Sequence, residues 1–512
     1  MDIIISIFTY GALFLFLLQL TKHFLISSKG SRTRNLPPSP PSLPIIGHLH
    51  HLKKPLHQYL ARLSAQHGPI LLLRFGVRPV LVVSSAALAE ECLTTNDIAF
   101  ANRPMLPSFK LSTYNYTNIA TSNYGPGWRE MRRIATIEAL SGHRLAFFSD
   151  VRADEARDLA RRLFRETEVG GFTRVEIRSR LYGLAMNVMM RVMVGKRCYG
   201  EENGDEEAQR FKKMVEEAFA DAGASNVGDF LPTAIGWFLR RSVERKLARI
   251  HSYRDGFLQG LVDERRRKRR VEEDEGRSAS KTMLDAILSM QKDQPEQYTD
   301  TFIKALFVTL LAAGTDTSSN TIEWALSLLL NNPEKLALAR KEIDEKVGHD
   351  RLFDESDLTN LSYLHCIINE TLRLYPVVPL LLPHHSLEPC KVGGYDISPG
   401  TMLMVNAYVI QRDPNIWSKP TEFIPERFQD AEAERGKILP FGMGRRKCPG
   451  EGLAMREVGL VLGTLIQCFE WRETGPEGLD LKEGAGITMP KANPLEAMCR
   501  PREVMVRALS QL

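Results

Sequence analysis

One cysteine stands in a loop that is rich in glycine and in cationic residues. Residues 440–450 read PFGMGRRKCPG, and a helical pattern over residues 451–469 begins directly after them. Glycines allow sharp turns and a close approach of the backbone to another group. Cys448 follows three cations and precedes the expected helix N-terminus, and both features favour a thiolate over a thiol. Because a thiolate is a soft, strongly donating ligand, the loop predicts a metal site at Cys448, the alternative being an inert cysteine in a basic loop.

A second group with chemical potential lies inside a long helical pattern over residues 301–332. Its middle reads AGTDTS, which includes Gly314, Asp316 and Thr317. Glycine weakens a helix, and hydroxyl side chains can bond back to its carbonyls and bend it. A buried acid and a buried hydroxyl are costly unless they hold water or join a hydrogen-bond network. We therefore expect a functional polar network here, the alternative being a capping cluster between two helices.

Two further pairs have the spacing of one helix face. Trp128 and Arg132 are four residues apart, so Arg132 could reach an acidic ligand while the indole packs beside it. The alternative is a surface arginine next to a core tryptophan. Glu370 and Arg373 are three residues apart in a helical pattern over residues 361–374. Such a pair alone is usually a surface ion pair that contributes little to stability.

The order of Phe441, Gly444, Arg446, Cys448 and Gly450 resembles the haem-binding loop of the cytochrome P450 family. The resemblance covers essentially the whole chain. It implies a large, mainly α-helical fold with a small β part, in which these residues bind haem b. Cys448 would be the axial ligand of the haem iron, a ligation that favours O–O cleavage in this family.

The resemblance also gives roles to the helical motifs. Gly314, Asp316 and Thr317 match the oxygen-activation groove of the family. Thr317 would hydrogen-bond bound dioxygen, and Asp316 would relay protons from solvent. Trp128 and Arg132 match a pair that meets a haem propionate.

Three charged residues match the family's structural network. Glu370 and Arg373 would join Arg427, which lies in the downstream segment FIPERF, in a buried cluster that holds the haem loop. Removing one member would strand a buried charge. His384 matches a position where the family places a propionate ligand, and a simple loop histidine is the equally weighted alternative.

The N-terminal region predicts a membrane anchor. Residues 3–20 form an apolar run just long enough to span a bilayer, with basic residues only after it. We assign residues 1–28 to a single transmembrane helix and residues 29–47 to a basic, proline-rich hinge. Residues 48–512 would form the haem-thiolate monooxygenase domain on the cytosolic face of the endoplasmic reticulum.

Composition limits the partners. The formal net charge of +5 over 512 residues is nearly balanced and indicates no nucleic-acid partner. Seven scattered cysteines argue against a disulfide framework and for a reducing compartment. The chain lacks a dinucleotide-binding fingerprint, so electrons would come from NADPH through a separate cytochrome P450 reductase. The basic residues Arg133, Arg445 and Lys447 would suit an acidic reductase surface.

The hinge and the segment YGPGWR resemble plant microsomal members of the family, and in particular its plant 81 group. This predicts an NADPH- and O2-dependent monooxygenase that hydroxylates a small hydrophobic specialised metabolite of isoflavonoid, lignan, terpenoid or alkaloid type. Six apolar residues are expected in the pocket: Leu306, Phe307, Leu310, Val377, Leu380 and Ile487. The alternatives are a haem-thiolate isomerase or dehydratase that needs no dioxygen, and a non-catalytic haem sensor.

Overall fold

The computed structural model describes residues 10, 11, 14 and 35–512, apart from 168–169, 199–225, 276–281, 430–437 and 476–477. The predicted anchor, residues 1–28, therefore lies almost wholly outside the described residues. Within the described ranges, no helix combines the length and the apolarity needed to cross a bilayer.

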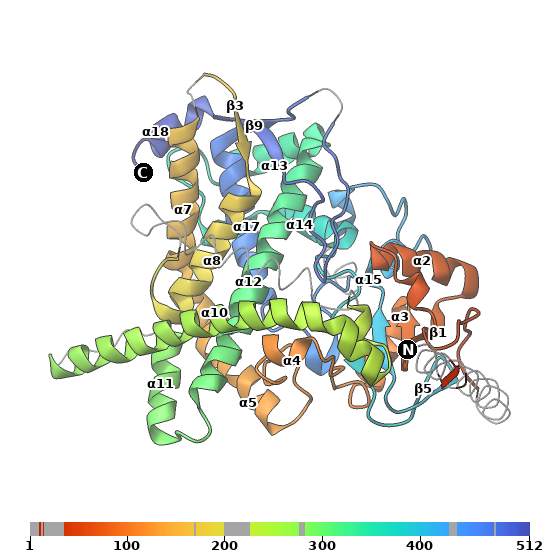
Figure 1. The fold of residues 1–512 in the computed structure, drawn as a ribbon. Helices are drawn as coiled ribbons and strands as arrows, with labels where there is room; N and C mark the ends of the chain where they lie inside the picture. The colour runs from red at the N-terminus through yellow and green to blue at the C-terminus, as the bar shows by residue number, and fades with distance from the viewer. Residues whose placement is uncertain are drawn as a thin grey trace, which may run out of the picture.

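Helices dominate the described structure, as predicted (Figure 1). The longer helices are α2 Leu56–His67, α5 Pro126–Ala135, α7 Ser149–Glu166, α8 Arg178–Val194, α10 Thr233–Asp274, α11 Met283–Asp293, α12 Asp300–Leu330, α13 Pro333–Lys346, α14 Ser362–Leu374 and α17 Glu451–Cys468. The shorter helices are α3 Ala86–Glu90, α4 Phe109–Ser112, α6 Gly142–Phe147, α15 Ala407–Ile410 and α18 Val506–Leu509.

The β part consists of small sheets. A four-stranded sheet has the order β1-β2-β7-β4, formed by Ile70–Phe75, Arg78–Val83, Met402–Val405 and His384–His385. A three-stranded sheet has the order β3-β9-β8, formed by Thr173–Glu176, Glu496–Pro501 and Phe469–Arg472. Strands β5 Cys390–Val392 and β6 Tyr395–Ile397 form a hairpin. The β1–β2 sheet lies beside the helical part in Figure 1.

Helix α12 is the central element of the helical part (Figure 1). It begins where the Thr299 side chain accepts a hydrogen bond from the Phe302 amide, and Pro333 opens the next helix soon after it ends. Its length agrees with the pattern over residues 301–332. It packs against α8, α17, α14 and α10, so nearly every side of it is covered by protein.

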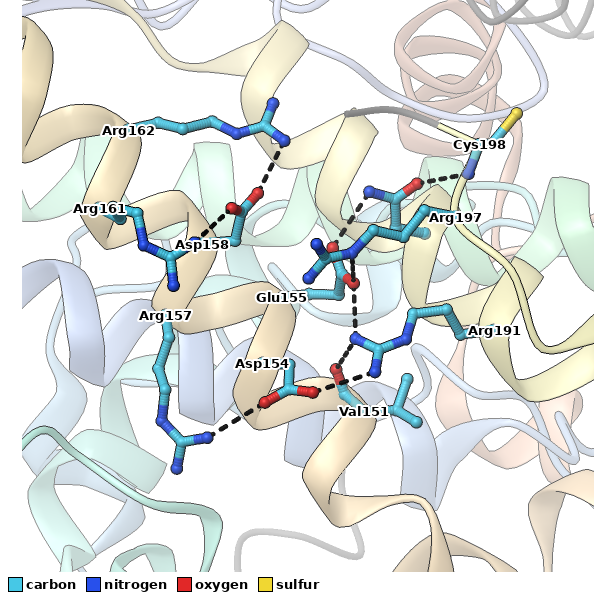
Figure 2. A network of polar contacts seen from close by, with 11 residues as sticks. Val151, Asp154, Glu155, Arg157, Asp158, Arg161, Arg162, Arg191, Arg197 and Cys198 are labelled. Atoms are coloured by element: carbon cyan, nitrogen blue, oxygen red, sulfur yellow. Dashed lines mark hydrogen bonds and ion pairs between the residues drawn. The ribbon is translucent and has the colours of Figure 1, made fainter. Parts of the chain in front are cut away.

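Buried ion pairs fix α7 against the end of α8 (Figure 2). The buried Glu155 carboxylate accepts hydrogen bonds from Arg191 and Arg197, each at 2.7 Å. Arg191 also donates to Asp154 at 3.0 Å. A buried carboxylate with two guanidinium partners has its charge compensated, so these contacts hold the two helices in register.

The described part of the hinge, from residue 35, lies along the β1–β2 sheet. The Leu72 amide donates to the Pro38 carbonyl at 2.9 Å, and His48 Nε2 lies 2.9 Å from the Pro40 carbonyl oxygen. This proline segment is therefore docked on the body of the protein.

Candidate active site

The loop before α17 turns twice through the left-handed backbone region. Gly442 and Gly444 both have a φ of +67°, which glycine adopts without the steric cost of a Cβ. At Gly444 a Cβ would also lie 2.0 Å from the carbonyl oxygen of Leu93. The turns bring the Gly450 amide to 3.4 Å from the Cys448 sulfur, to which it donates a hydrogen bond.

The Cys448 sulfur faces an internal cavity rather than bulk water. Burial raises the pKa of the Cys448 thiol, and this effect outweighs the Gly450 amide, Arg132 and Lys447, which lower it. Lys447 acts in the predicted direction, but desolvation of the thiolate raises the pKa by more than this cation lowers it. A bound metal ion deprotonates a coordinating thiol. Binding of the haem iron would therefore convert the Cys448 thiol into the thiolate ligand.

The loop and α12 line the same cavity, which has a volume of about 430 Å³. Phe441, Arg446, Cys448 and Gly450 line it from the loop, and Phe441 also accepts a hydrogen bond from the Cys448 amide at 2.8 Å. Gly444 instead packs against the backbone of Leu93.

The rest of the cavity wall is mainly apolar. Of the six residues expected there, Leu310, Val377 and Ile487 line the cavity. Leu306 and Phe307 are instead buried in the helical core, and Leu380 packs beside the β1–β2 sheet. The prediction is wrong for these three residues because a residue on α12 or in the loop after α14 can face the core as readily as the cavity. Other residues, which were not predicted, also line the cavity: Phe109, Thr113, Ile250, Val308, Ala312 and Leu381.

Four arginines line the cavity without an acidic partner in the described part of the chain, and three of them, Arg103, Arg132 and Arg446, lie close enough to repel one another. Arg446 donates to the carbonyls of Ala101 at 2.6 Å and Ser122 at 2.7 Å. Arg103 donates to the carbonyls of Leu382 and Pro383, and its buried Nε has no partner. Arg132, the third of these residues, is half-buried.

Burial and mutual repulsion lower the pKa of these arginines. The pKa of Arg103 falls to about 9, through burial and the charge of Arg446. The pKa of Arg446 falls to about 10, through burial and the charge of Arg132. A group that brings two negative charges would relieve this repulsion. The arginines and the soft cysteine ligand thus fit haem b, which carries two propionates and an iron.

The Trp128 side chain lies between the two predicted cofactor arginines. The guanidinium of Arg446 lies 4.2 Å from its ring centroid and that of Arg132 lies 5.4 Å away. Its indole N–H donates to the Ile119 carbonyl at 3.0 Å, so that donor is already used by the backbone. Trp128 therefore orients the two arginines by cation–π contact.

His384 is a buried residue of the short strand β4 and not of a loop. It lines the cavity, and its Nδ1 lies 2.8 Å from the carbonyl oxygen of Phe100. Burial, with the charges of Arg103 and Arg446, holds its pKa well below the ordinary value. The imidazole is therefore neutral with its proton at Nδ1, and its Nε2 is an acceptor. A donor role toward a propionate would require a second proton and stays a prediction.

Helix α12 stays α-helical through the predicted polar motif. Gly314 and Thr317 line the cavity, whereas Asp316 is half-buried and is not among the residues that line it. The Thr317 hydroxyl donates to the Ala313 carbonyl at 2.5 Å, which leaves its oxygen able to accept a hydrogen bond from a ligand. Packing also favours glycine at position 314, because a Cβ there would lie 2.6 Å from the sulfur of Met189.

The three structural residues come together as one buried group. Both oxygens of Glu370 accept hydrogen bonds from Arg373, at 2.6 and 2.8 Å, and Arg427 donates to Glu370 at 3.1 Å. Arg373 also donates to the Gln411 carbonyl at 2.7 Å. The Gln411 side chain accepts from the Leu439 amide at 2.8 Å. This connects the network to the start of the Cys448 loop.

Sequence reasoning missed Arg103, Gln411 and Glu457. Arg103 stands in an irregular stretch, and the carbonyls that hold it come about 280 residues later in the chain. Glu457 lies on α17, fully buried, with one carboxyl oxygen that has no hydrogen-bond partner. A polar residue within the otherwise apolar run of α17 was the only local signal for Glu457.

These features define a class of protein in which a cysteine and a set of arginines that line one apolar cavity would hold haem. The family model named Cytochrome P450 matches residues 37–495 of this chain. The chain belongs to the cytochrome P450 family, and it is therefore a haem-thiolate monooxygenase that binds haem b.

The curated relatives are plant proteins of the 81 group. Cytochrome P450 81Q32 from Catharanthus roseus is 50% identical over 482 residues, which cover 94% of each chain. The (+)-piperitol/(+)-sesamin synthase CYP81Q2 from Sesamum radiatum is 48% identical and covers 95% of this chain and 94% of its own. Isoflavone 2'-hydroxylase from Glycyrrhiza echinata is 44% identical and covers 99% of this chain and all of its own.

Proposed function

We propose that this protein hydroxylates a small, mostly hydrophobic plant specialised metabolite, using dioxygen and electrons from NADPH delivered by a separate reductase. The observation that carries the proposal is one apolar cavity lined both by Cys448 and by Gly314 and Thr317. Relatives named for isoflavone hydroxylation and for sesamin synthesis support an isoflavonoid-like or lignan-like substrate.

The haem, when bound through Cys448, supplies dioxygen activation and the oxidising power for the reaction. The protein supplies binding, orientation and proton control. Arg103, Arg132 and Arg446 would hold the two carboxylates of the cofactor. The hydroxyl of Thr317 would accept a hydrogen bond at the reaction centre, and Asp316, the preceding residue on α12, would bring protons toward it from outside the cavity wall. The apolar wall excludes bulk water and holds the substrate carbon in place.

An apolar surface supports contact with the endoplasmic reticulum membrane. At the start of α10 the side chains of Ile235, Trp237, Phe238 and Leu239 are all exposed, although they are large and hydrophobic. Exposed apolar clusters of this kind mark membrane or protein contacts. Together with an anchor in residues 1–28 they would fix the protein on the membrane beside its reductase.

Reductase docking would use the face around the Cys448 loop, where Arg133, Arg445 and Lys447 lie. Each of these cations has a nearby acid: Arg133 pairs with Glu130, Arg445 with Asp97 and Lys447 with Glu451. Much of the positive charge on this face is thus balanced locally, so the attraction for an acidic partner is weaker than the sequence indicates.

The carbon-monoxide difference spectrum of the reduced protein in microsomes tests the proposal. We expect a Soret band shifted far to the red, and we expect Cys448→Ala to lose it, because the thiolate is the iron ligand. Addition of NADPH, a reductase and a metabolite of the named classes should then give a product with one added oxygen. A spectrum typical of histidine-ligated haem would contradict the assignment of Cys448.

A further inference from the structure

The cavity has a polar end that the reaction chemistry does not use. Arg254, on α10, lines the cavity and is only 7% exposed. Its Nη2 donates to the carbonyl of Ser112 at 2.6 Å, which ties it to the end of α4. Ile250, one turn earlier on α10, lines the same cavity, so this helix forms part of the wall.

Within the described residues, three buried polar atoms at this end make no hydrogen bond of good geometry: Arg254 Nε, His251 Nδ1 and the Tyr114 hydroxyl, which lies near Arg254 and Asp255. They lie close together, because the Tyr114 ring is 5.0 Å from the His251 ring and 5.9 Å from the Arg254 guanidinium. A buried polar atom without a partner costs free energy in the folded protein. Three of them beside one cavity indicate a place that a polar ligand completes.

The charges at this end do not cancel. Lys304 forms an ion pair with Asp255 at 2.7 Å, which balances both. Burial lowers the pKa of His251 and raises the pKa of Tyr114, so both are neutral near pH 7. In the described part of the chain Arg254 has no carboxylate within ion-pair distance. Two cations, Arg254 and Lys304, therefore share the single carboxylate of Asp255, and these groups carry a net charge of +1.

We infer that Arg254 is a substrate-recognition residue and that the substrate is an elongated apolar molecule ending in a monoanionic oxygen group, either a carboxylate or an acidic phenolate. The inference rests on the proposed function and narrows its substrate class. An anionic oxygen would pair with the Arg254 guanidinium, while the apolar body of the molecule fills the cavity toward Cys448.

Helix α12 sets the length of such a molecule. Lys304 lies beside the same Tyr114 ring as Arg254, and Val308 lines the cavity one turn further on. Val308 and Lys304 precede Thr317 by nine and thirteen residues, which corresponds to roughly 13 and 20 Å along a helix. The anchored oxygen and the oxidised carbon should thus be on the order of 15 Å apart.

The test measures binding of rigid probes to the haem-loaded protein. The probes are biphenyl-4-carboxylate and p-terphenyl-4-carboxylate, each compared with its methyl ester, and dissociation constants come from the haem spectral shift and from calorimetry. We expect the terphenyl acid to bind at least about tenfold more tightly than its ester, as a charge-assisted hydrogen bond allows. In Arg254→Met this preference should fall to about twofold or less, and Arg254→Lys should keep part of it.

Arg265→Met is a matched control on the same helix. Arg265 is also buried, but it is paired with Asp285 at 2.6 Å and with Glu272 at 3.0 Å. We expect the control to lower the melting temperature and to leave the acid preference intact. Arg254→Met should melt at or above the wild-type temperature, because it removes an unpaired buried charge.

Equal binding of acid and ester by the wild-type protein would overturn the inference. So would an Arg254→Met variant that keeps the preference, or one that is destabilised as much as the control or fails to fold, since Arg254 would then be structural. The carbon-monoxide spectrum of the same preparations distinguishes a failure of this inference from a failure of the proposed function. A normal thiolate spectrum without acid preference removes only this inference, whereas an absent thiolate spectrum removes the proposed function.

Discussion

A single carboxyl on α17 shows how far the interior alters an acid. Glu457 is fully buried, and its only hydrogen bond within the described part of the chain is a long one, 3.4 Å, from the Ser318 hydroxyl of α12. Burial raises the pKa of Glu457 to about 8, although the charge of Arg152 lowers it in part. Glu457 therefore carries a proton at pH 7. Its neighbour Ser318 directly follows Thr317 on α12.

This shift makes stability depend on pH in a defined direction. The unfolded chain loses the Glu457 proton near pH 4.5, and the folded protein keeps it up to about pH 8. Between these values the folded state binds more protons, so stability falls as the pH rises. Glu457→Gln has no titratable group at this position. Its free energy of unfolding, relative to that of the wild-type protein, should therefore rise by up to about 1.4 kcal/mol for each pH unit in that window.

Urea unfolding at several pH values between these limits measures the difference, with Glu503→Gln as an exposed control. The control should follow the wild-type curve throughout. A constant difference between Glu457→Gln and the wild-type protein across the window would show that Glu457 does not hold this proton.

The residues that the sequence could predict are those whose partners lie close in the chain or in a fixed motif. Cys448, Gly444 and Thr317 belong to such motifs: Cys448 and Thr317 line the same cavity, and Gly444 has the positive φ of a sharp turn. Arg103 and Glu457 gain their properties from burial by distant segments, which no local spacing records. The burial that raises the pKa of Cys448 is another such property, since it depends on the whole cavity wall.

At the scale of elements, the Cys448 loop offers a matched pair of glycines. Gly442 and Gly444 share a φ of +67°, but a Cβ at Gly442 would meet nothing within 4 Å, whereas one at Gly444 would lie 2.0 Å from the Leu93 carbonyl oxygen. An alanine substitution at Gly442 therefore measures the cost of the backbone conformation alone. The same substitution at Gly444 adds a steric clash with Leu93.

Gly442→Ala should cost about 1–2 kcal/mol of stability and keep the haem, because only the left-handed conformation is penalised. Gly444→Ala should displace the loop from Leu93 and lower haem content severely. Haem content per protein, from the absorbance of purified variants, checks both. Similar haem content in the two variants would mean that the contact with Leu93 does not hold the loop.

Helix boundaries were largely predictable, while longer-range shape was not. The patterns over residues 301–332, 361–374 and 451–469 agree with α12, α14 and α17 to within two residues. Their ends are set by local signals such as the Thr299 cap and Pro333. Which side of α12 faces the cavity depends on where α10 and the loop after α14 pack, so half of the apolar pocket residues were placed wrongly.

At the scale of the whole molecule, the Glu370 network joins segments that are far apart in the chain. Besides Arg373 and Arg427, the Ile424 amide donates to Glu370 at 2.9 Å. Glu370 and Arg373 are completely buried. The group therefore ties α14 to the chain segment that leads into the Cys448 loop.

Glu370→Gln should lower the free energy of unfolding by about 3–5 kcal/mol, because two arginines would keep buried charges with no carboxylate. It should also lower haem retention through the link from Arg373 to Gln411 and Leu439. Glu422→Gln is the control, since its pair with Lys419 is exposed and should be worth less than about 1 kcal/mol. Urea unfolding and haem content measure both, and equal behaviour of the two variants would contradict a central role for Glu370.

The thiols of the protein differ in chemical availability. Four are buried, two are half-buried and only Cys448 is exposed, and it opens into the cavity; the buried ones are Cys92, Cys366, Cys468 and Cys499. Burial raises the pKa of Cys92, Cys468 and Cys499, which makes them poor nucleophiles. A newly made chain without cofactor thus offers an alkylating or oxidising molecule one exposed sulfur, at the position on which activity depends, besides the half-buried Cys198 and Cys390. Insertion of haem is therefore also a chemical protection step, and the fraction of chains with an adduct at Cys448 would report how many still lack haem.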